Sequence, residues 1–510
     1  MATMIAVAAK FRRTNPVAGA GRTSYSAAMA LTRERMLERM LASDPSYDGR
    51  FLTGVLSTGI YCLPSCRARK PKPENVRFFQ RPDQAVAAGL RPCKRCRPED
   101  FYRDHDPDRE RLQEVVGELV ADPASVADVA TMAARIGVGS SKLSELTRRH
   151  YHTTARDLIT RARIDAARRA LLSSRRAVTD IAFDTGFETL SAFHACFRKL
   201  NYLSPSRYRA LGRSARFELE LPRWFQRDRV LAYLGRDPDS PSERVDGTTL
   251  RFATRLDGRV AAVAVDFVNG RARCRVGGAG SRGNSATAAA VAHHQVIRLL
   301  GLVTDPGPFE RRVRAGGHPE LIAGRRGLTV PQTRDLCEGL TWVVLGQQVS
   351  LPVALALRRR LIERLGAPVG DLRAHPEPDD VAAVDHEELR AIGLSSRKAE
   401  YLTGLAERTL RGEFDGIGAA TATATATEQR LLAVRGLGPW SCNYLMMRSL
   451  GLGDCVPVGD AALLRALVRF FDLAERPTPY ATRELLAPFA PHRSLATFHL
   501  WASLQVQQQG

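Results

Sequence analysis

Hydrophobic positions along the chain follow two different periods, and the change between them marks its main divisions. From about residue 121 to 209 apolar residues recur every three or four positions, which predicts helices throughout. They alternate in TTLRFATRL, VAAVAVDFV and RARCRVGG, which predicts an antiparallel sheet. Helical spacing returns near Ala288 and continues to the end. We expect loops at 303–318, 366–380 and 411–428, the last containing the low-complexity run TATATAT.

Two blocks within the first helical region resemble each other. SVADVATMAARIGVGSSKLSELTRR predicts a helix, a turn at 137–139 and a second helix, and AVTDIAFDTGFETLSAFHACFRKL repeats this pattern around Gly186. A basic helix, LITRARIDAARRALL, joins them. Paired helix-turn-helix units with a glycine in each turn are suited to two contacts with the major groove of DNA.

Length and charge indicate the number of domains and the kind of binding partner. A chain of 510 residues exceeds one hydrophobic core, which predicts three or four domains. Lys and Arg exceed Asp and Glu by 75 to 54, or +21, and residues 1–213 hold 37 basic and 22 acidic residues, or +15. The basic excess lies in the first half, so we expect a polyanionic partner there.

The sequence predicts neither a signal peptide nor a membrane span. MIAVAAKFRR has no positive segment before its apolar run, so it does not predict a signal peptide, and no apolar run reaches membrane-spanning length. The nine cysteines then favour a reducing compartment, where clustered thiols bind metal or react. We expect a cytoplasmic protein without a membrane partner, associated with the nucleoid when bound to DNA, with a disordered lead-in at residues 1–30.

Four cysteines lie in two short pairs, Cys62-x3-Cys66 in TGIYCLPSCRARK and Cys93-x2-Cys96 in RPCKRC. Four thiolates complete the tetrahedral coordination of one Zn2+, so the first interpretation is a closed structural site. Basic residues surround the pairs: Arg67, Arg69, Lys70, Lys72, Lys94, Arg95 and Arg97. We expect Arg67, Arg69 and Arg95 to contact DNA.

TGIYCLPSCRARKPKPENVRFF and AAGLRPCKRC together resemble the N-terminal module of Ada-type adaptive-response proteins. The resemblance covers about residues 31–100. It implies that Cys62 is both a zinc ligand and the acceptor of a methyl group from a DNA methylphosphotriester. Cys66, Cys93 and Cys96 are then the remaining ligands. Because a thioether is stable, each molecule acts once.

The second helical block resembles the AraC-type DNA-binding domain through Ala182, Gly186, Phe187, Phe193 and Phe197, followed by LSPSRYR. The phenylalanines fit the core of a helix pair, and we expect base reading from the exposed faces at 140–148 and 189–199. Ala195 stands where the family often has a polar contact residue, and Tyr202 where glycine is common. Sequence-specific reading by this second unit therefore stays an open question.

ATEQRLLAVRGLGPWSCNYLMMRSLGLGDCVPVGDAALLRALV predicts a helix, a tight hairpin and a second helix that begins at Pro439. Gly436 and Gly438 permit positive φ, so successive backbone amides can face a phosphate. A GxG pair alone is most often only a turn. Asp460 alone is most simply the N-cap of the next helix.

Asn443, Tyr444, Arg448 and the step Pro457-x-x-Asp460 together resemble the helix-hairpin-helix DNA glycosylases. Asp460 falls at the position of the family's catalytic aspartate, which implies that it stabilises an oxocarbenium-like sugar and assists the attacking water. Trp440 stands where the lyases of this superfamily carry a Schiff-base lysine. The resemblance therefore implies a monofunctional enzyme that leaves an abasic site.

Within that superfamily, the chain from about Phe217 to Trp501 resembles the AlkA-type 3-methyladenine glycosylases. The resemblance implies that Trp440, Tyr444 and Trp501 line the base pocket. It also implies that Gln347 and Gln348 enter the duplex in place of the flipped base, Gln348 replacing an apolar residue of some members. A single Trp is more often core, but three aromatic residues at family positions favour a pocket.

The sequence thus predicts a mostly α, multidomain chain. We expect a disordered lead-in (1–30), a small zinc module with four cysteine ligands (31–103), a double helix-turn-helix domain (115–212), a small antiparallel α+β subdomain (216–290) and an all-α helix-hairpin-helix glycosylase domain (291–510). The Pro-Cys-His-Arg tetrapeptide of the second Ada methyltransferase domain does not occur. Reversal of O6-methylguanine is therefore not expected.

The resemblances imply an alkylation-damage repair and response protein. It transfers methyl groups from phosphotriesters to Cys62, activates transcription, and excises alkylated bases of the 3-methyladenine and 7-methylguanine type as a DNA-3-methyladenine glycosylase II. Its expected partners are alkylated duplex DNA, promoter DNA and RNA polymerase, and we expect a monomer. Two alternatives stay open: a transcription regulator with an inactive glycosylase module, or a glycosylase whose N-terminal half only tethers it to DNA.

Overall fold

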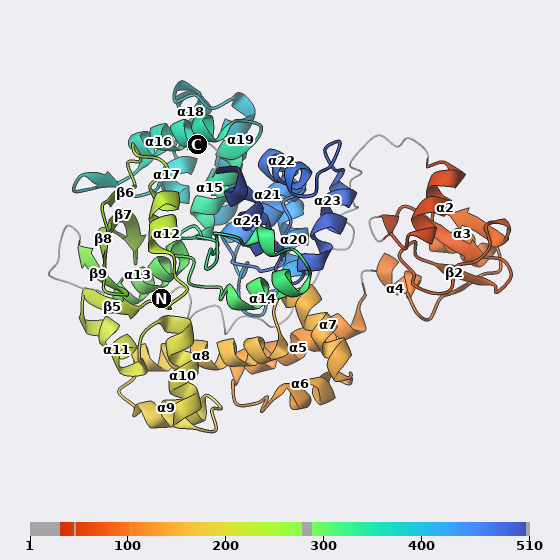
Figure 1. Ribbon diagram of the computed structural model, residues 1–510, viewed down its shortest axis with the longest axis horizontal. Coiled ribbons are helices and arrows are strands. Elements are labelled where there is room, and N and C mark those ends of the chain that lie inside the picture. The colour runs from red at the N-terminus through yellow and green to blue at the C-terminus, as the bar shows by residue number, and fades with distance from the viewer. Residues whose placement is uncertain (1–30, 45–46, 104, 278–287, 506–510) are drawn as a thin grey trace. The chain divides into compact units, whose positions relative to one another are not determined.

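The computed structural model describes residues 31–44, 47–103, 105–277 and 288–505, and the chain divides into two units between Arg111 and Leu112 (Figure 1). The expected disordered lead-in lies outside the described residues. The secondary structure is mainly helical, with one small sheet in the first unit and a larger one in the second. None of the helices in the described ranges is long and apolar enough to cross a membrane.

The first unit is built on a four-stranded sheet of order β3-β1-β2-β4. Its strands are β1 (Leu52–Val55), β2 (Ile60–Cys62), β3 (Val76–Phe79) and β4 (Arg91–Pro92). The helices around them are α2 (Arg33–Leu41), η3 (Pro73–Asn75), α3 (Pro82–Ala87) and α4 (Pro98–Tyr102). β2 pairs antiparallel with β1 and parallel with β4. A core that includes Leu52, Tyr61 and Phe79 lies against the sheet.

The double helix-turn-helix arrangement predicted from the sequence is confirmed in the second unit. Its elements are α5 (Pro107–Ala121), α6 (Val129–Ile136), α7 (Ser140–Tyr151), α8 (Ala155–Ser173), α9 (Val178–Asp184), α10 (Leu190–Asn201), α11 (Pro205–Ala210) and η4 (Leu211–Arg213). α8 spans both helix pairs (Figure 1). Gly137 and Gly186 make the two turns at positive φ.

The two recognition helices end alike, on a left-handed residue that is not glycine. His152 caps α7 at φ 53°, and Tyr202 caps α10 at φ 56°. Such a conformation costs a residue with a Cβ about 1–2 kcal/mol. Tyr202 occupies the position where glycine is common, and its hydroxyl donates a hydrogen bond of 2.8 Å to the carbonyl of Leu302. Tyr202, which departs from the family's glycine, therefore connects the end of α10 to the segment at Leu302.

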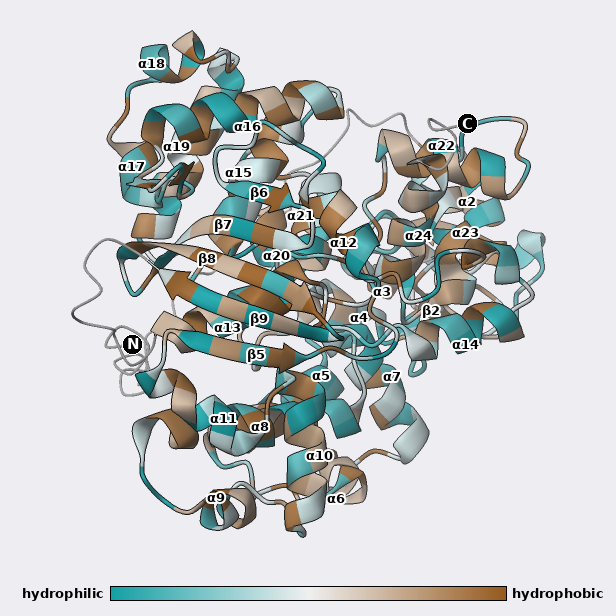
Figure 2. Cartoon of the chain, turned by 60° about the vertical axis from the view of Figure 1, so that its left-hand side comes forward, coloured by the Kyte–Doolittle hydropathy of each residue, from teal (hydrophilic) through white to brown (hydrophobic). Residues whose placement is uncertain are grey.

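The alternating runs form the expected antiparallel sheet, with the order β5-β9-β8-β7-β6. Its strands are β5 (Arg216–Glu220), β6 (Glu243–Asp246), β7 (Thr249–Leu256), β8 (Arg259–Val268) and β9 (Arg271–Gly277). β7 and β8 pair in register from Thr249 opposite Asp266 to Leu256 opposite Arg259. Hydrophobic and polar residues alternate along the strands (Figure 2). The apolar face packs on α13 (Ala288–Leu299), and α12 (Arg227–Leu234) precedes β6.

One hydrophobic core joins this sheet to the second helix-turn-helix. The cluster contains buried side chains from α8 to α11 and from the sheet and α13, among them Ile164, Phe193, Phe197, Tyr208, Phe252, Val263, Val265 and Val296. His293 lies at the contact, 2% exposed, with Nε2 2.8 Å from the carbonyl oxygen of Asn201. The second helix-turn-helix unit and the sheet therefore form a continuous packed body.

The remaining chain is a helical domain. Its helices are α14 (Gly307–Ala315), η5 (Pro319–Leu321), α15 (Leu336–Gly346), α16 (Leu351–Leu365), α17 (Pro378–Ala382), α18 (His386–Ala391), α19 (Ser396–Leu410), α20 (Ala424–Leu432), α21 (Pro439–Arg448), α22 (Ala461–Phe470), α23 (Pro479–Leu486), η6 (Ala487–Phe489) and α24 (Arg493–Gln505). β10 (Pro368–Val369) and β11 (Leu372–Arg373) form a short ladder. The largest core of the second unit lies among these helices.

The three expected loops were wrong in part, because each contains regular structure. α14 lies within 303–318, β10 and β11 lie within 366–380, and α20 begins inside the TATATAT run. Alanine is the best helix former, and the Thr423 hydroxyl caps α20 by accepting from the amide of Ala426 at 3.0 Å. The alanine and threonine residues of the TATATAT run therefore begin a helix.

Candidate metal centre and active site

The four cysteines are brought together by two neighbouring parallel strands. Cys62 is the last residue of β2 and Cys93 follows β4, which pairs with β2 through Tyr61 opposite Pro92. The amide of Cys93 donates to the Tyr61 carbonyl at 3.0 Å, which fixes this register. Cys66 and Cys96 return on the turns that follow each strand. The four Sγ atoms lie within 4.8 Å of one another.

The donor set fits zinc. Four sulfur atoms at a tetrahedral Zn2+ lie about 3.8 Å apart for Zn–S bonds of about 2.3 Å, so the observed cluster closes with small side-chain adjustments. Without a metal, hydrogen bonds from Cys62 and Cys96 lower the pKa of the Cys66 thiol, and the hydrogen bond between Cys62 and Cys66 raises the pKa of Cys62, so the metal-free cluster favours a thiolate at Cys66. The amide of Leu63 also donates to the sulfur of Cys96 at 3.4 Å.

Exposure divides the cysteines into two pairs. Cys66 and Cys93 are buried, while Cys62 and Cys96 are partly exposed. Solvent access alone therefore leaves two candidates for a reactive sulfur, and only the sequence resemblance selects Cys62. The basic residues expected to contact DNA, Arg67, Arg69 and Arg95, are exposed or partly exposed beside the cluster, and Nη1 of Arg95 donates to the Arg67 carbonyl at 3.3 Å.

In the second unit, the predicted helix, hairpin and helix are confirmed as α20, residues 433–438 and α21. Gly436 has φ 95°, and a Cβ at this position would lie 2.7 Å from the ring of Tyr401, so glycine is required for two reasons. Gly438 does not adopt the positive φ that glycine permits. This residue has φ −97° and is the extended N-cap of α21, a conformation open to any residue.

Asp460 is the N-cap of α22, and its Oδ1 accepts from the amide of Leu463 at 2.7 Å. Two indoles also donate to it: Nε1 of Trp440 to Oδ2 at 3.0 Å, and Nε1 of Trp501 to Oδ1 at 2.9 Å. Three donors from three segments therefore hold one carboxylate. The capping role and the catalytic role expected for Asp460 are compatible in this geometry.

The aromatic residues expected to form a base pocket lie together around this carboxylate. The Tyr444 ring centroid lies 5.4 Å from that of Trp440 and 6.0 Å from that of Trp501. Trp342 joins them, because its Nε1 donates to the Tyr444 hydroxyl at 2.8 Å. Sequence reasoning missed Trp342, although its place in TWVVLGQQ, five residues before Gln347, was a usable signal.

The two glutamines after α15 differ in their surroundings. Gln347 reaches across to the hairpin, where Nε2 donates to the Gly436 carbonyl at 2.7 Å and to the Ser441 hydroxyl at 3.2 Å. Gln348 is exposed, with φ 56°. Nζ of Lys398 donates to the Leu345 carbonyl at 2.6 Å and supports the end of α15. Gln347 thus joins this loop to the hairpin, and only Gln348 projects freely.

Asn443 connects the hairpin helices to the segment that leads to Asp460. Its Nδ2 donates to Glu428 on α20 at 3.0 Å and to the Pro439 carbonyl at 3.2 Å. Its Oδ1 accepts from the amide of Val456 at 3.1 Å. The side chain is 9% exposed and all three bonds are internal. Asn443 therefore fixes the position of the segment before Asp460 relative to the hairpin.

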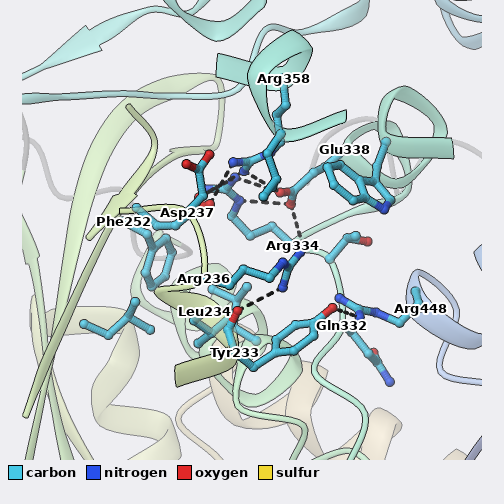
Figure 3. A pocket seen from close by; sticks show the side chains of 16 residues that line it. Tyr233, Leu234, Arg236, Asp237, Phe252, Gln332, Arg334, Glu338, Arg358 and Arg448 are labelled. Atoms are coloured by element: carbon cyan, nitrogen blue, oxygen red, sulfur yellow. Dashed lines mark hydrogen bonds and ion pairs between the residues drawn. The ribbon is translucent and has the colours of Figure 1, made fainter. Parts of the chain in front are cut away.

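A cavity of about 60 Å3 lies between the sheet and α15, and four charged residues at its upper end pair with one another (Figure 3). Arg334 lies 2.9 Å from Glu338, and Arg358 lies 2.7 Å from Glu243 and 3.2 Å from Glu338. The guanidiniums keep the pKa of the Glu338 carboxyl well below its usual range despite burial. These pairs, which the sequence did not reveal, join the sheet to the helical domain.

Comparisons with known proteins identify three domains along the chain. Residues 35–99 match the metal binding domain of Ada, residues 132–211 match a helix-turn-helix domain, and residues 341–491 match the HhH-GPD superfamily of base excision DNA repair proteins. The four cysteines are therefore the metal site of an Ada-type domain, with the donor set of one Zn2+.

Three relatives cover different shares of the chain. A probable bifunctional transcriptional activator/DNA repair enzyme AlkA of Mycobacterium tuberculosis is 29% identical over 92% of this chain and 96% of its own length. DNA-3-methyladenine glycosylase 2 of Escherichia coli is 30% identical over 41% of this chain and 70% of its own length. The bifunctional transcriptional activator/DNA repair enzyme Ada of Escherichia coli is 51% identical over 14% of this chain and 20% of its own length.

Fold and site together define a DNA-binding base excision repair protein that carries an Ada-type zinc domain and a helix-turn-helix regulator domain. The chain belongs to the DNA-3-methyladenine glycosylase 2 family. The predictions of a multidomain, mainly helical fold and of a four-cysteine zinc module are confirmed.

Proposed function

We propose that this chain is an alkylation-damage repair and response protein with two chemical activities and one regulatory activity. It takes methyl groups from DNA methylphosphotriesters, excises alkylated bases as a monofunctional glycosylase, and activates transcription at promoter DNA. The observation that carries the glycosylase function is the carboxylate of Asp460, held by two indoles of an aromatic pocket. The names of the relatives support transcription activation, DNA repair and excision of 3-methyladenine.

For methyl transfer, we assign the acceptor to Cys62 and the other metal contacts to Cys66, Cys93 and Cys96. A bound Zn2+ keeps these sulfurs as thiolates at neutral pH. The sulfur of Cys62 attacks the methyl carbon of the phosphotriester, an S–C bond forms as the C–O bond breaks, and the departing oxygen keeps the electron pair. The basic side chains of Arg67, Arg69 and Arg95 bring the phosphate to the cluster.

For base excision, we assign Trp440, Tyr444 and Trp501 to the pocket for the flipped base. Stacking on an aromatic ring contributes about 1–3 kcal/mol per base. As the N-glycosidic bond breaks, its electrons leave with the base, and the Asp460 carboxylate stabilises the positive charge on the sugar. Water then adds to the sugar carbon and loses a proton toward Asp460. No lysine stands at the Trp440 position, so the product is an abasic site.

For DNA engagement, we assign Gly436 and Gly438 to the phosphate-binding hairpin and Gln348 to the position vacated by the flipped base. Gln347 belongs to the same DNA-binding loop, which it holds to the hairpin through Gly436. The positive φ of Gly436 allows the backbone amides of the hairpin to converge on a phosphate.

The same proposal includes the domain limits 31–103, 115–212, 216–290 and 291–510, within which the matched segments and the sheet β5–β9 fall. We propose that the chain acts as a monomer in the cytoplasm, on chromosomal DNA, and contacts RNA polymerase as an activator. Light scattering of the purified chain tests the monomer. Co-sedimentation with RNA polymerase on promoter DNA tests the contact.

One experiment tests both chemical activities. The protein is incubated with methylated duplex DNA, and the Cys62 peptide is examined by mass spectrometry while free bases are separated by chromatography. We expect a gain of one methyl group on that peptide and released 3-methyladenine. Absence of both would refute the proposal. Methyl transfer alone would support the regulator with an inactive glycosylase module, and base release alone the glycosylase with a DNA tether.

A further inference from the structure

The end of α7 lies against the part of the helical domain that precedes Asp460. α7 packs on α20, the first helix of the hairpin motif, and Nδ1 of the buried His150 lies 2.9 Å from the Thr425 hydroxyl oxygen. His152, which caps α7, makes the next contact, with Nδ1 3.8 Å from Sγ of Cys455. The first helix-turn-helix therefore contacts both the hairpin motif and the segment that leads to the proposed catalyst.

The packing around His152 is close. A Cβ at Gly453 would lie 3.6 Å from the carbonyl oxygen of His152, and Cys455 is 1% exposed. Asp454, between these two residues, is held by Arg493 at the start of α24, with Nε 2.7 Å from Oδ1 and Nη2 2.7 Å from Oδ2. Burial lowers the pKa of His152 to about 4, so its imidazole is neutral at pH 7 and adds no charge beside this ion pair.

Hydrogen bonds continue from this contact to Asp460. The amide of Val456, the residue after Cys455, donates to Oδ1 of Asn443 at 3.1 Å. The amide of Asp460 itself donates to the carbonyl of Pro457 at 3.1 Å. Only five positions separate Cys455 from the carboxylate, and the bonds between them limit how far the segment can adjust. A displacement of Cys455 is therefore passed on to Asp460.

His152 makes this contact from a backbone conformation that glycine adopts more readily. Its φ is 53°, and Tyr202, the equivalent residue of the second helix-turn-helix, has φ 56°. In both units the side chain at this position reaches the enzyme half of the chain. Tyr202 bonds the carbonyl of Leu302, in the core shared with the sheet, whereas His152 meets Cys455 on the way to Asp460. The two caps therefore differ in the segment that they support.

We propose that His152 is a positioning residue for base excision: through Cys455 it holds the segment that carries Asp460, which makes the first helix-turn-helix a functional part of the glycosylase. The proposal rests on the glycosylase function proposed above. Because His152 acts on the segment and not on the base, it should affect the rate of bond cleavage and not the affinity for DNA. A misplacement of about 1 Å can slow catalysis about 100-fold, so loss of one support should slow it about 10-fold.

The test measures excision from a duplex with one 7-methylguanine by the full chain, under single-turnover conditions with saturating protein. In His152→Gly, glycine keeps the left-handed cap of α7 and removes only the imidazole. We expect the maximal rate to fall about 10-fold, while the affinity for an abasic duplex stays within about 2-fold of wild type. His152→Asn is the conservative variant, because asparagine also accepts this conformation and its amide can replace Nδ1, so its rate should stay within about 2-fold of wild type.

Tyr202→Gly is the matched control, since it makes the same change at the equivalent cap. It removes a larger side chain and a hydrogen bond, so it should lower the midpoint of thermal unfolding more than His152→Gly does. At a temperature where both variants are folded, its maximal rate should still be within about 2-fold of wild type. If His152→Gly does not fold, Cys455→Ala removes the other half of the contact and should also slow excision about 10-fold.

The outcomes separate the two proposals. Wild-type protein that releases no base contradicts the proposed function, and the inference falls with it. A folded His152→Gly variant with the wild-type rate overturns the role of His152 alone and leaves the glycosylase function intact. Equal losses of rate in His152→Gly and Tyr202→Gly also overturn it, because they indicate general damage, and so does a rate in His152→Asn as low as that in His152→Gly.

Discussion

The indole Nε1 of Trp440 donates a hydrogen bond of 3.0 Å to Oδ2 of Asp460, so a residue proposed to line the base pocket directly holds the carboxylate proposed as the catalyst. Trp501 holds the other oxygen from α24. In the proposed function, a base that enters between these rings lies beside the carboxylate that stabilises the sugar. The proposed pocket and the proposed catalyst then belong to one hydrogen-bonded unit.

Asp460→Asn tests the carboxylate with little change in the fold. Asparagine keeps the helix cap, but its amide nitrogen cannot accept from the Trp440 indole, so the free energy of unfolding should fall by about 1–3 kcal/mol. Loss of the negative charge should slow base release at least about 100-fold. Single-turnover release of 3-methyladenine from methylated DNA measures the rate, and urea unfolding measures stability. Unchanged release in Asp460→Asn would favour another catalyst.

Cys62 and Cys96 are both partly exposed, so a pair of single substitutions is needed to distinguish them. We expect Cys62→Ser to abolish methyl uptake from methylphosphotriester DNA, and Cys96→Ser to keep a methyl gain on Cys62 when enough zinc is bound. Intact-protein and peptide mass spectrometry measure uptake, and metal analysis measures zinc. Cys196→Ser, outside the cluster, is the control and should take up the full amount. A methyl group on Cys96 would reassign the acceptor.

Methylation of Cys62 should also strengthen DNA binding, because it removes one negative charge from the cluster. At about 10 Å from a phosphate, one unit of charge contributes about 0.4–1.7 kcal/mol for effective dielectric constants of about 80 to 20. Over a few phosphates, the affinity should rise about tenfold or more at low salt, and the gain should shrink as salt is added. Fluorescence anisotropy with the two forms of the protein measures this, and equal affinities would contradict it.

Gln347 and Gln348 should respond differently to substitution. Gln347→Ala removes two bonds to the hairpin, so it should lower both the stability, by about 1 kcal/mol, and the affinity for DNA. Gln348→Gly suits the positive φ of this position, so stability should be kept while excision falls. Thermal unfolding and binding to an abasic duplex measure the two effects. Full excision by Gln348→Gly would show that this residue does not enter the duplex.

Acid should destabilise the second unit through buried neutral histidines. Burial lowers the pKa of His293 to about 3, so the unfolded chain takes up a proton at higher pH than the folded one. The stability that this residue contributes is complete above about pH 6.5 and falls by up to about 1.4 kcal/mol per pH unit below it. His293→Gln should show a shallower fall between pH 6.5 and 4 in urea unfolding. An identical slope would contradict the assignment.

Local patterns in the sequence predicted much of this structure, and contacts between distant segments account for most of the remainder. Helical and alternating periods revealed the paired helices and the sheet, and the glycine turn with Pro439 revealed the hairpin. Local pattern also indicated Asp460 as a helix cap, while its catalytic role came from the family resemblance and stays a prediction. These features depend on neighbouring residues, which is why a single sequence contains them.

Other features depend on residues far apart in the chain. Tyr202 contacts Leu302, Trp342 contacts Tyr444, and the pairing of Glu243 with Arg358 spans more than a hundred residues. No periodicity encodes such pairs. Glycine permits positive φ without requiring it, so the sequence alone did not distinguish the extended Gly438 from Gly436.

The shared core between the second helix-turn-helix and the sheet has a consequence for genetics. A missense allele at Phe197, Tyr208 or Val263 damages one packed body, so it should abolish promoter response and base excision together. Alleles that separate the two phenotypes should therefore map to exposed positions such as Arg198 or to the pocket itself. A screen should therefore recover alleles that impair only regulation or only repair at surface and pocket positions. Alleles in the shared core should impair both.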